Sequence, residues 1–149
     1  MRKSIYAGAA MLAAITVTSA IAAPATPTRQ AATTKLTAFV TVNQEIPAPK
    51  GARGSGTFTA TVTGRTIKFR LNFKGLTGAA GAAHIHVALA GKAMPAPAAS
   101  LCGPCKSGQT GTVTVTAAVL KSILGGGTYV NVHTAKNAGG EIRGQIAAS

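Results

Sequence analysis

Residues 57–74 read TFTATVTGRTIKFRLNFK, in which apolar and polar side chains alternate on both sides of Gly64-Arg65. Because successive side chains of a strand point to opposite faces, each half of the stretch has one apolar and one polar face. Glycine adopts positive φ without strain, so Gly64-Arg65 is typical of a tight turn. The stretch therefore predicts an antiparallel hairpin with one buried and one solvated side.

The same period of two recurs along the rest of the chain. Apolar positions at helical spacing over residues 117–124 are followed by three glycines, which predicts one short helix. The other segments with strand periodicity cover residues 36–42, 82–89, 112–116, 128–133 and 141–147. With about seven short strands and one helix, we expect an all-β fold, an antiparallel β-sandwich with Greek-key connections.

The N-terminal segment has the composition of an export signal. Arg2 and Lys3 precede an apolar run over residues 5–17, and residues 20–22 fit a small-x-small cleavage site. The run is shorter than the roughly 20 residues of a membrane-spanning helix. We therefore expect residues 1–22 to be a signal peptide, no membrane span after its removal, and a secreted or periplasmic protein.

The remainder of the chain is expected to be a flexible linker at residues 23–34 and one domain at residues 35–149. The chain has 15 lysines and arginines against two acidic residues, a formal net charge of +13. Such a charge favours solubility, or weak association with a polyanion or an anionic cell surface. Nucleic-acid binding is not expected, because the basic residues are dispersed and the chain has no tryptophan to stack on bases.

The two cysteines, Cys102 and Cys105, lie in a stretch rich in glycine, proline and alanine that is predicted to be a long loop over residues 90–111. Cys-Gly-Pro-Cys has the spacing of thiol oxidoreductases, whose chemistry needs a turn from a strand into a helix. Here a strand is predicted to follow. The alternative to a redox site is a structural disulfide, which forms by default in an oxidising compartment. We therefore expect Cys102 and Cys105 to be joined by a disulfide that holds the loop in shape.

All three histidines of the chain lie on the polar faces of two predicted strands. His84 and His86 share one face of the strand at residues 82–89, and His133 ends the strand at residues 128–133. If these strands are neighbours, the three imidazoles converge, and neutral imidazole suits copper and zinc. The alternative is that the first two form a polar pair bonded to the backbone, while the third satisfies the loop that follows it.

The last strand adds two charged residues to this candidate metal site. We expect it to form a hairpin with the preceding strand through the pairs Tyr129–Gln145, Asn131–Arg143 and His133–Glu141. Glu141 is then a candidate fourth ligand or a group that orients an imidazole, and Arg143 a candidate for guiding a small anion. The alternative is an ordinary cross-strand ion pair between these two side chains.

The segments that carry the histidines resemble the two signatures of the CHRD (chordin) domain family. These segments read AHIH at residues 83–86, YVNVHT at 129–134 and GEIRGQI at 140–146, and NQEIP at 43–47 resembles the N-terminal motif. The resemblance covers about residues 36–147. It implies an extracellular domain of the kind found as repeats in the antagonist chordin and as secreted single-domain bacterial proteins. This chain is similar to the second group, which implies a non-catalytic binding or structural module with an unidentified extracellular ligand.

A second similarity is to the sandwich of copper–zinc superoxide dismutase. It rests on the His-x-His strand, the later Val-His strand, and the turn at residues 137–140 before the strand with Arg143. It implies a metal at His84, His86 and His133, with the arginine guiding superoxide. Because the zinc ligands of that family are missing, the alternative function is that of a mononuclear copper or zinc protein, and whether the chain is an enzyme stays open.

Overall fold

A computed structural model describes residues 32–149. The expected signal peptide at residues 1–22, and the expected linker as far as residue 31, lie outside the described residues. The elements in chain order are β1 (Thr33–Thr41), the 3-10 helix η1 (Val42–Gln44), β2 (Ser55–Thr63), β3 (Thr66–Lys74), β4 (Ala80–Val87), β5 (Ala99–Cys102), β6 (Gln109–Thr114), α1 (Ala117–Leu124), β7 (Thr128–Thr134), β8 (Ile142–Gln145) and β9 (Ala147–Ala148). The first strand therefore includes the last two positions of the expected linker.

The predicted hairpin forms from β2 and β3, and its two faces differ as the alternation requires. Gly64 in its turn has a φ of 59°, which glycine adopts without strain. Phe58 and Leu71 lie opposite each other and are fully buried, whereas Thr59 and Arg70 are also paired and are exposed. The strands thus have one side in the core and one side in water.

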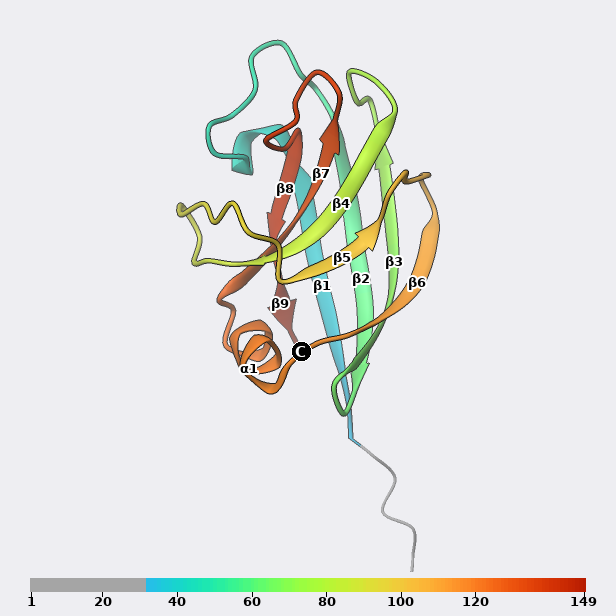
Figure 1. Cartoon of the computed structure of the whole chain (residues 1–149), viewed down its shortest axis with the longest axis vertical. Helices are drawn as coiled ribbons and strands as arrows, with labels where there is room; N and C mark the ends of the chain where they lie inside the picture. The colour runs from blue at the N-terminus through green and yellow to red at the C-terminus, as the bar shows by residue number, and fades with distance from the viewer. Residues whose placement is uncertain (1–31) are drawn as a thin grey trace, which may run out of the picture.

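The nine strands of the described part of the chain form one antiparallel sheet in the order β5-β4-β7-β8-β1-β2-β3-β6, with β9 added on β1 (Figure 1). The all-β antiparallel class with one short helix is confirmed. The sheet curls until β5 and β6 come into contact, so it is nearly closed and barrel-like rather than divided into two separate sheets. The strand that joins the two halves is β1, which pairs with β2 along its whole length and with β8 at Thr41 and Arg143.

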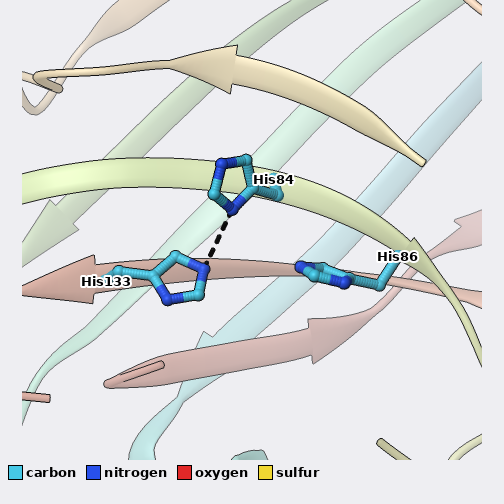
Figure 2. A group of neighbouring side chains, drawn as sticks. All are labelled: His84, His86 and His133. Atoms are coloured by element: carbon cyan, nitrogen blue, oxygen red, sulfur yellow. Dashed lines mark hydrogen bonds between the residues drawn. The ribbon is translucent and has the colours of Figure 1, made fainter. Parts of the chain in front are cut away.

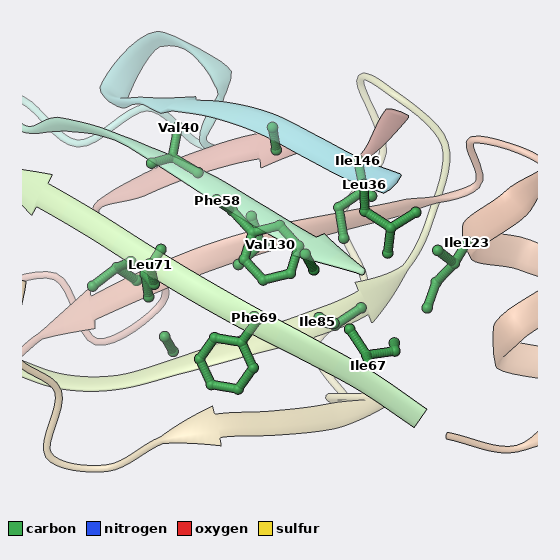
Figure 3. Close-up of a cluster of buried hydrophobic side chains, with 14 of the residues drawn as sticks. Leu36, Val40, Phe58, Ile67, Phe69, Leu71, Ile85, Ile123, Val130 and Ile146 are labelled. Carbon is green, nitrogen blue, oxygen red and sulfur yellow. The ribbon is translucent and has the colours of Figure 1, made fainter. Parts of the chain in front are cut away.

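The apolar core fills the inside of this curled sheet. Figure 3 shows side chains from β1, β2, β3, β4 and β7 meeting there, with Ile123 of α1 closing one end. The helix has the predicted bounds, and Oγ1 of Thr116 caps it by accepting the N–H of Val119 at 3.2 Å. None of the helices within residues 32–149 is long and apolar enough to cross a membrane.

The strands β4, β7 and β8 differ from the hairpin because their outward face is also buried or half-buried. All residues of β7 from Thr128 to Val132 are buried, irrespective of the side to which they point. The loop at residues 88–98 and the loop at residues 135–141 cover this face, and their backbone carbonyls bond side chains beneath them. The fold therefore contains a second, polar interior between the sheet and its loops.

Candidate metal centre

The pairing of β4, β7 and β8 brings the three histidines onto one face. The predicted pairs Asn131–Arg143 and Tyr129–Gln145 are both present in the β7–β8 hairpin. On the other side of β7, His84 lies opposite Asn131 and His86 opposite Tyr129. His133 follows on the same face of β7, so the sheet register itself places the imidazoles side by side.

The three rings converge as Figure 2 shows. Nδ1 of His84 lies 3.1 Å from Nε2 of His133, and one ring nitrogen of each histidine lies within 4.8 Å of those of the other two. An ion that is held tetrahedrally by imidazoles at about 2.0–2.1 Å keeps its ligand atoms about 3.3 Å apart. Two of the nitrogens thus have the spacing of ligands to one ion. The ring nitrogen of His86 lies within 4.8 Å of the other two and would have to move by up to about 1.5 Å to complete the set.

Backbone carbonyls determine which nitrogen of two of these rings faces the other histidines. Nδ1 of His86 lies 3.2 Å from the carbonyl of Ala96, and Nδ1 of His133 lies 2.9 Å from that of Ala138. A carbonyl only accepts hydrogen bonds, so both Nδ1 atoms carry a proton, and the neutral ring of His86 presents a lone pair at Nε2. Nε2 of His133 lies between Nδ1 of His84 and Oδ1 of Asn131. Nε2 of His86 is buried and has no hydrogen-bond partner within residues 32–149. Such an orphaned lone pair is rare in protein interiors, where polar atoms are usually paired.

The surroundings favour the neutral imidazoles that metals bind. Burial, followed by the neighbouring His133 and His86, lowers the pKa of His84. Burial also lowers the pKa of His86, which is 3% exposed, although hydrogen bonds to the carbonyls of Ala96 and Met94 oppose the shift. Both rings are therefore held in the neutral form at neutral pH, which is the form that binds metals.

The carboxyl group beside the histidines belongs to Glu45. This residue is part of the N-terminal motif and was not predicted to lie near the histidines. It is 5% exposed, and its Oε2 has no hydrogen-bond partner among the described residues. Burial raises the pKa of Glu45. Hydrogen bonds from the Ile46 backbone and the Asn131 side chain, and the charges of Arg143 and His133, lower the pKa but do not cancel the shift. This side chain reaches the site from the loop after η1, a connection that no local pattern reveals.

Glu141 lies elsewhere, which corrects the expectation that it ligates or orients an imidazole. Its carboxylate accepts from the amide and hydroxyl of Thr77, the hydroxyl of Thr134 and the side-chain amide of Asn137, at 2.6 to 2.9 Å. None of these four hydrogen bonds within residues 32–149 involves a histidine. Burial pushes the pKa of Glu141 upward, but these donors outweigh it and hold the pKa below its usual value. Glu141 is therefore a buried structural anion in the connection between β7 and β8, directly before β8.

Arg143 is a packed side chain rather than one half of an ion pair with Glu141. Its guanidinium carbon lies 3.5 Å from the ring centroid of Tyr129, and this ring stacks on His86 at 4.9 Å with an interplanar angle of 6°. Nη2 of the arginine donates to the carbonyl of Lys92 at 2.6 Å. The guanidinium, the phenol and the imidazole thus form a stack beneath the loop at residues 88–98. The role of Arg143 in guiding an anion stays a prediction.

A pocket of about 350 Å³ lies beside the histidines. Its walls include His86, His133, Glu45 and Asn131, together with parts of the two covering loops. Oδ1 of Asn131 lies 3.0 Å from Nε2 of His133 and so faces the same atom as His84. The pocket has room for a small molecule next to a metal held by the three rings.

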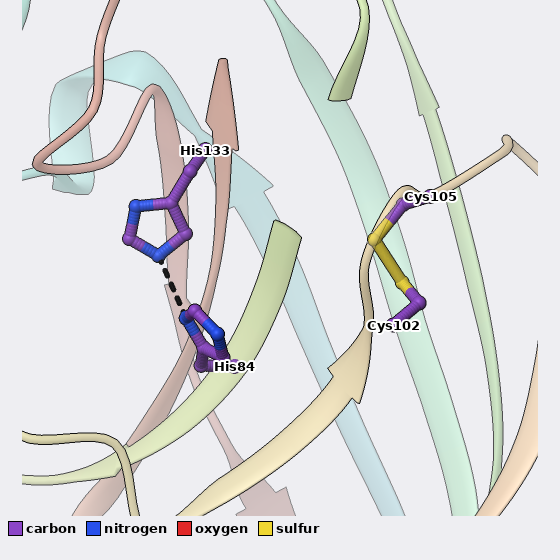
Figure 4. Close-up of a disulfide and its surroundings, with 4 residues drawn as sticks. All are labelled: His84, Cys102, Cys105 and His133. Carbon is purple, nitrogen blue, oxygen red and sulfur yellow. Dashed lines mark hydrogen bonds between the residues drawn. A yellow bond between two sulfur atoms is a disulfide. The ribbon is translucent and has the colours of Figure 1, made fainter. Parts of the chain in front are cut away.

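The cysteines lie at the edge of the strand that carries two of the histidines. The structure joins Cys102 to Cys105 by a disulfide, and Figure 4 shows it to one side of β4, away from His84 and His133. Cys102 ends β5, a strand that falls within the predicted loop at residues 90–111, and pairs with Ala83. The N–H of Cys105 donates to the carbonyl of Ala80 at 2.9 Å. The clip therefore holds the chain after β5 against β4.

Comparison with known proteins gives one match. The model of the CHRD domain family matches residues 36–146, a range that contains all three histidines, both cysteines and Glu45. No curated protein and no solved structure matches the chain.

Proposed function

This chain belongs to the CHRD domain family, and from that starting point we propose that it is an exported binding module whose domain holds one copper or zinc ion through His84, His86 and His133. The signal-like residues 1–22 and the disulfide support a location outside the cytoplasm, where thiols oxidise. The extracellular ligand of the module is unassigned, and the metal is proposed as part of the surface that meets it.

The observation that carries the metal proposal is the unpartnered Nε2 of His86. Without a metal, the pair formed by His84 and His133 shares one proton, and the third imidazole points a buried lone pair at no donor. A single cation satisfies all three nitrogens at once. Copper(II) and zinc(II) are borderline-soft ions, and such ions bind neutral imidazole well.

The residues around the three rings have supporting roles in this proposal. The carbonyls of Ala96 and Ala138 fix the rings of His86 and His133 so that Nε2 faces inward, which is how ligand histidines are usually oriented. Glu45 adds a carboxyl group at the same pocket, next to an ion that would favour its ionised form.

The direct test is the metal content of the purified protein. The full chain, exported so that the disulfide forms, is stripped with a chelator, mixed with Cu(II) or Zn(II), desalted and analysed by mass spectrometry of the metal. We expect a single ion per chain, and loss of that ion in His84→Ala, His86→Ala and His133→Ala. Glu141→Gln is the matched control, because it removes a buried carboxyl group that lies apart from the three nitrogens.

The control separates ligand loss from damage to the fold. We expect Glu141→Gln to lower stability and keep the metal, and the histidine variants to keep their fold and lose the metal. If the three histidine variants bind as much metal as the unaltered chain, the domain is a binding module without a metal.

Superoxide dismutation is a second candidate function, favoured by the pocket that adjoins the histidines. Copper would supply one-electron chemistry there, whereas zinc has no accessible redox state. The copper-loaded chain should therefore consume superoxide and the zinc-loaded chain should not. Arg143→Gln should retain copper and lower the rate if the arginine guides the anion. A copper-loaded chain without activity would restrict the site to binding.

A further inference from the structure

The surface charge of the domain has one sign. The chain has only two acidic residues, Glu45 and Glu141, and both are buried. Of the basic residues within 32–149, Arg143 is buried, and the others are exposed: Lys35, Lys50, Arg53, Arg65, Lys68, Arg70, Lys74, Lys92, Lys106, Lys121 and Lys136. Every exposed charged side chain in the described part of the chain is therefore positive. Among the described residues, no exposed aspartate or glutamate side chain weakens the attraction of an anionic partner.

Some of these cations form a regular array on the outward side of β1, β2 and β3. Lys35 lies opposite Thr61, which lies opposite Lys68, and in the next row Thr59 lies opposite Arg70. Strands are about 4.8 Å apart and every second residue is about 6.8 Å along, so the three cations are about 7 to 12 Å apart. Threonine hydroxyls occupy the positions between them. A depression of about 410 Å³ runs among these side chains.

An aromatic ring lies at the edge of the same array. Phe39 points outward from β1, is 76% exposed, and lies opposite Thr57 one row beyond Thr37 and Thr59. We call the outward side chains of Lys35, Thr37, Phe39, Thr59, Thr61, Lys68 and Arg70 the threonine–lysine face. Unlike the face with the histidines, it lies on strands whose outward side chains are exposed.

We propose that the threonine–lysine face binds an acidic polysaccharide. The cations would meet the carboxylate or sulfate groups that repeat along such a chain, and the hydroxyls would bond its sugar hydroxyls. The exposed ring of Phe39 offers a flat apolar surface to the carbon face of a sugar. Single-stranded nucleic acid is bound by several stacking aromatics, and a membrane surface by a broad apolar face, whereas this array offers one ring.

The test uses oligogalacturonate, a chain of sugar acids, and its methyl ester, which has the same backbone without charge. Binding to the purified chain is measured by calorimetry in metal-free buffer at low and at physiological salt. We expect binding of the acid, no binding of the ester, and weaker binding as salt rises. Lys68→Gln/Arg70→Gln should reduce the affinity about tenfold. Phe39→Ser should reduce it about fivefold at either salt concentration.

The matched control is Lys92→Gln/Lys136→Gln. It removes the same two charges from the loops on the histidine side of the domain, so it should leave the affinity within about twofold. All of these positions are exposed, and thermal unfolding checks that each variant folds. Equal losses in the two double variants would overturn the proposal, because only net charge would then matter. Binding of the ester, or tighter binding to polyphosphate or anionic vesicles with no effect of Phe39→Ser, would also overturn it.

Discussion

The β2–β3 hairpin and the β7–β8 hairpin have the same alternation of apolar and polar residues, but only the first has a side in water. Outward side chains such as Thr59 and Arg70 are exposed, whereas the outward Tyr129, Asn131 and Arg143 are buried under loops. Alternation therefore tells which side of a strand faces the apolar core. It does not tell whether the other side is solvated or encloses a second set of contacts.

The largest expected effect lies on the core side of the first hairpin. Phe58→Ala removes a fully buried ring and should lower the free energy of unfolding by about 3–5 kcal/mol. Its outward neighbour Thr59 is exposed, and Thr59→Ala should change the same quantity by less than about 0.5 kcal/mol. Urea denaturation of both variants measures the contrast. Similar losses in the two would mean that the outward side of this hairpin is also packed.

The second expected effect is stabilisation of the β7–β8 side by metal. At a free metal concentration one hundred times the dissociation constant, the folded state should gain about 2.7 kcal/mol. Thermal unfolding of the stripped chain with and without Cu(II) or Zn(II) measures this gain. His86→Ala should unfold at the same temperature in both conditions. A shift that persists in this variant would place the metal outside the three-histidine site.

The third effect concerns the buried anion at the mouth of that hairpin. Glu141→Gln leaves donors from Thr77, Thr134 and Asn137 without a charged acceptor and should cost about 2 kcal/mol at neutral pH. The pKa of Glu141 is lowered in the folded chain, so its stabilisation is present above the unfolded pKa and is lost as pH falls through the folded pKa. Unfolding measured between neutral and acidic pH should show this loss in the unaltered chain and not in the variant.

The smallest effect has the opposite sign. The pKa of Glu45 is raised in the folded chain, so its ionisation opposes folding as pH rises from the unfolded pKa through the folded one. Glu45→Gln should therefore stabilise the stripped protein by about 1 kcal/mol at neutral pH and by less in acid. Unfolding curves over this pH range test the sign. A loss of stability at neutral pH would mean that the ionised carboxylate has a partner that the variant lacks.

The features that could be predicted from sequence depend on contacts between near neighbours in the chain. The β2–β3 turn follows from Gly64, the helix from its apolar spacing and its glycine stop, and the pairing of Asn131 with Arg143 from two alternating segments joined by a short link. Each of these patterns is local, so the chain around it hardly alters the outcome.

The features that were missed depend on contacts between distant segments. The segment at residues 99–102 has no alternation and becomes β5 only by pairing with the edge of β4. Curling into one nearly closed sheet depends on β1 pairing on both of its sides. Glu45 reaches the histidines through a loop, while Glu141, close to them in sequence, is captured by Thr77 from another part of the chain.

The stack of Arg143, Tyr129 and His86 also gives the protein an optical signal of its own. The chain has no tryptophan and two tyrosines, of which Tyr6 lies in the expected signal peptide. Once that segment is removed, the ultraviolet fluorescence of the domain comes from Tyr129, whose ring lies against a proposed metal ligand. Copper at that ligand would quench the emission, and zinc would leave it bright. Binding of copper at the site can then be followed through the fluorescence of Tyr129, without a label, in the intact molecule.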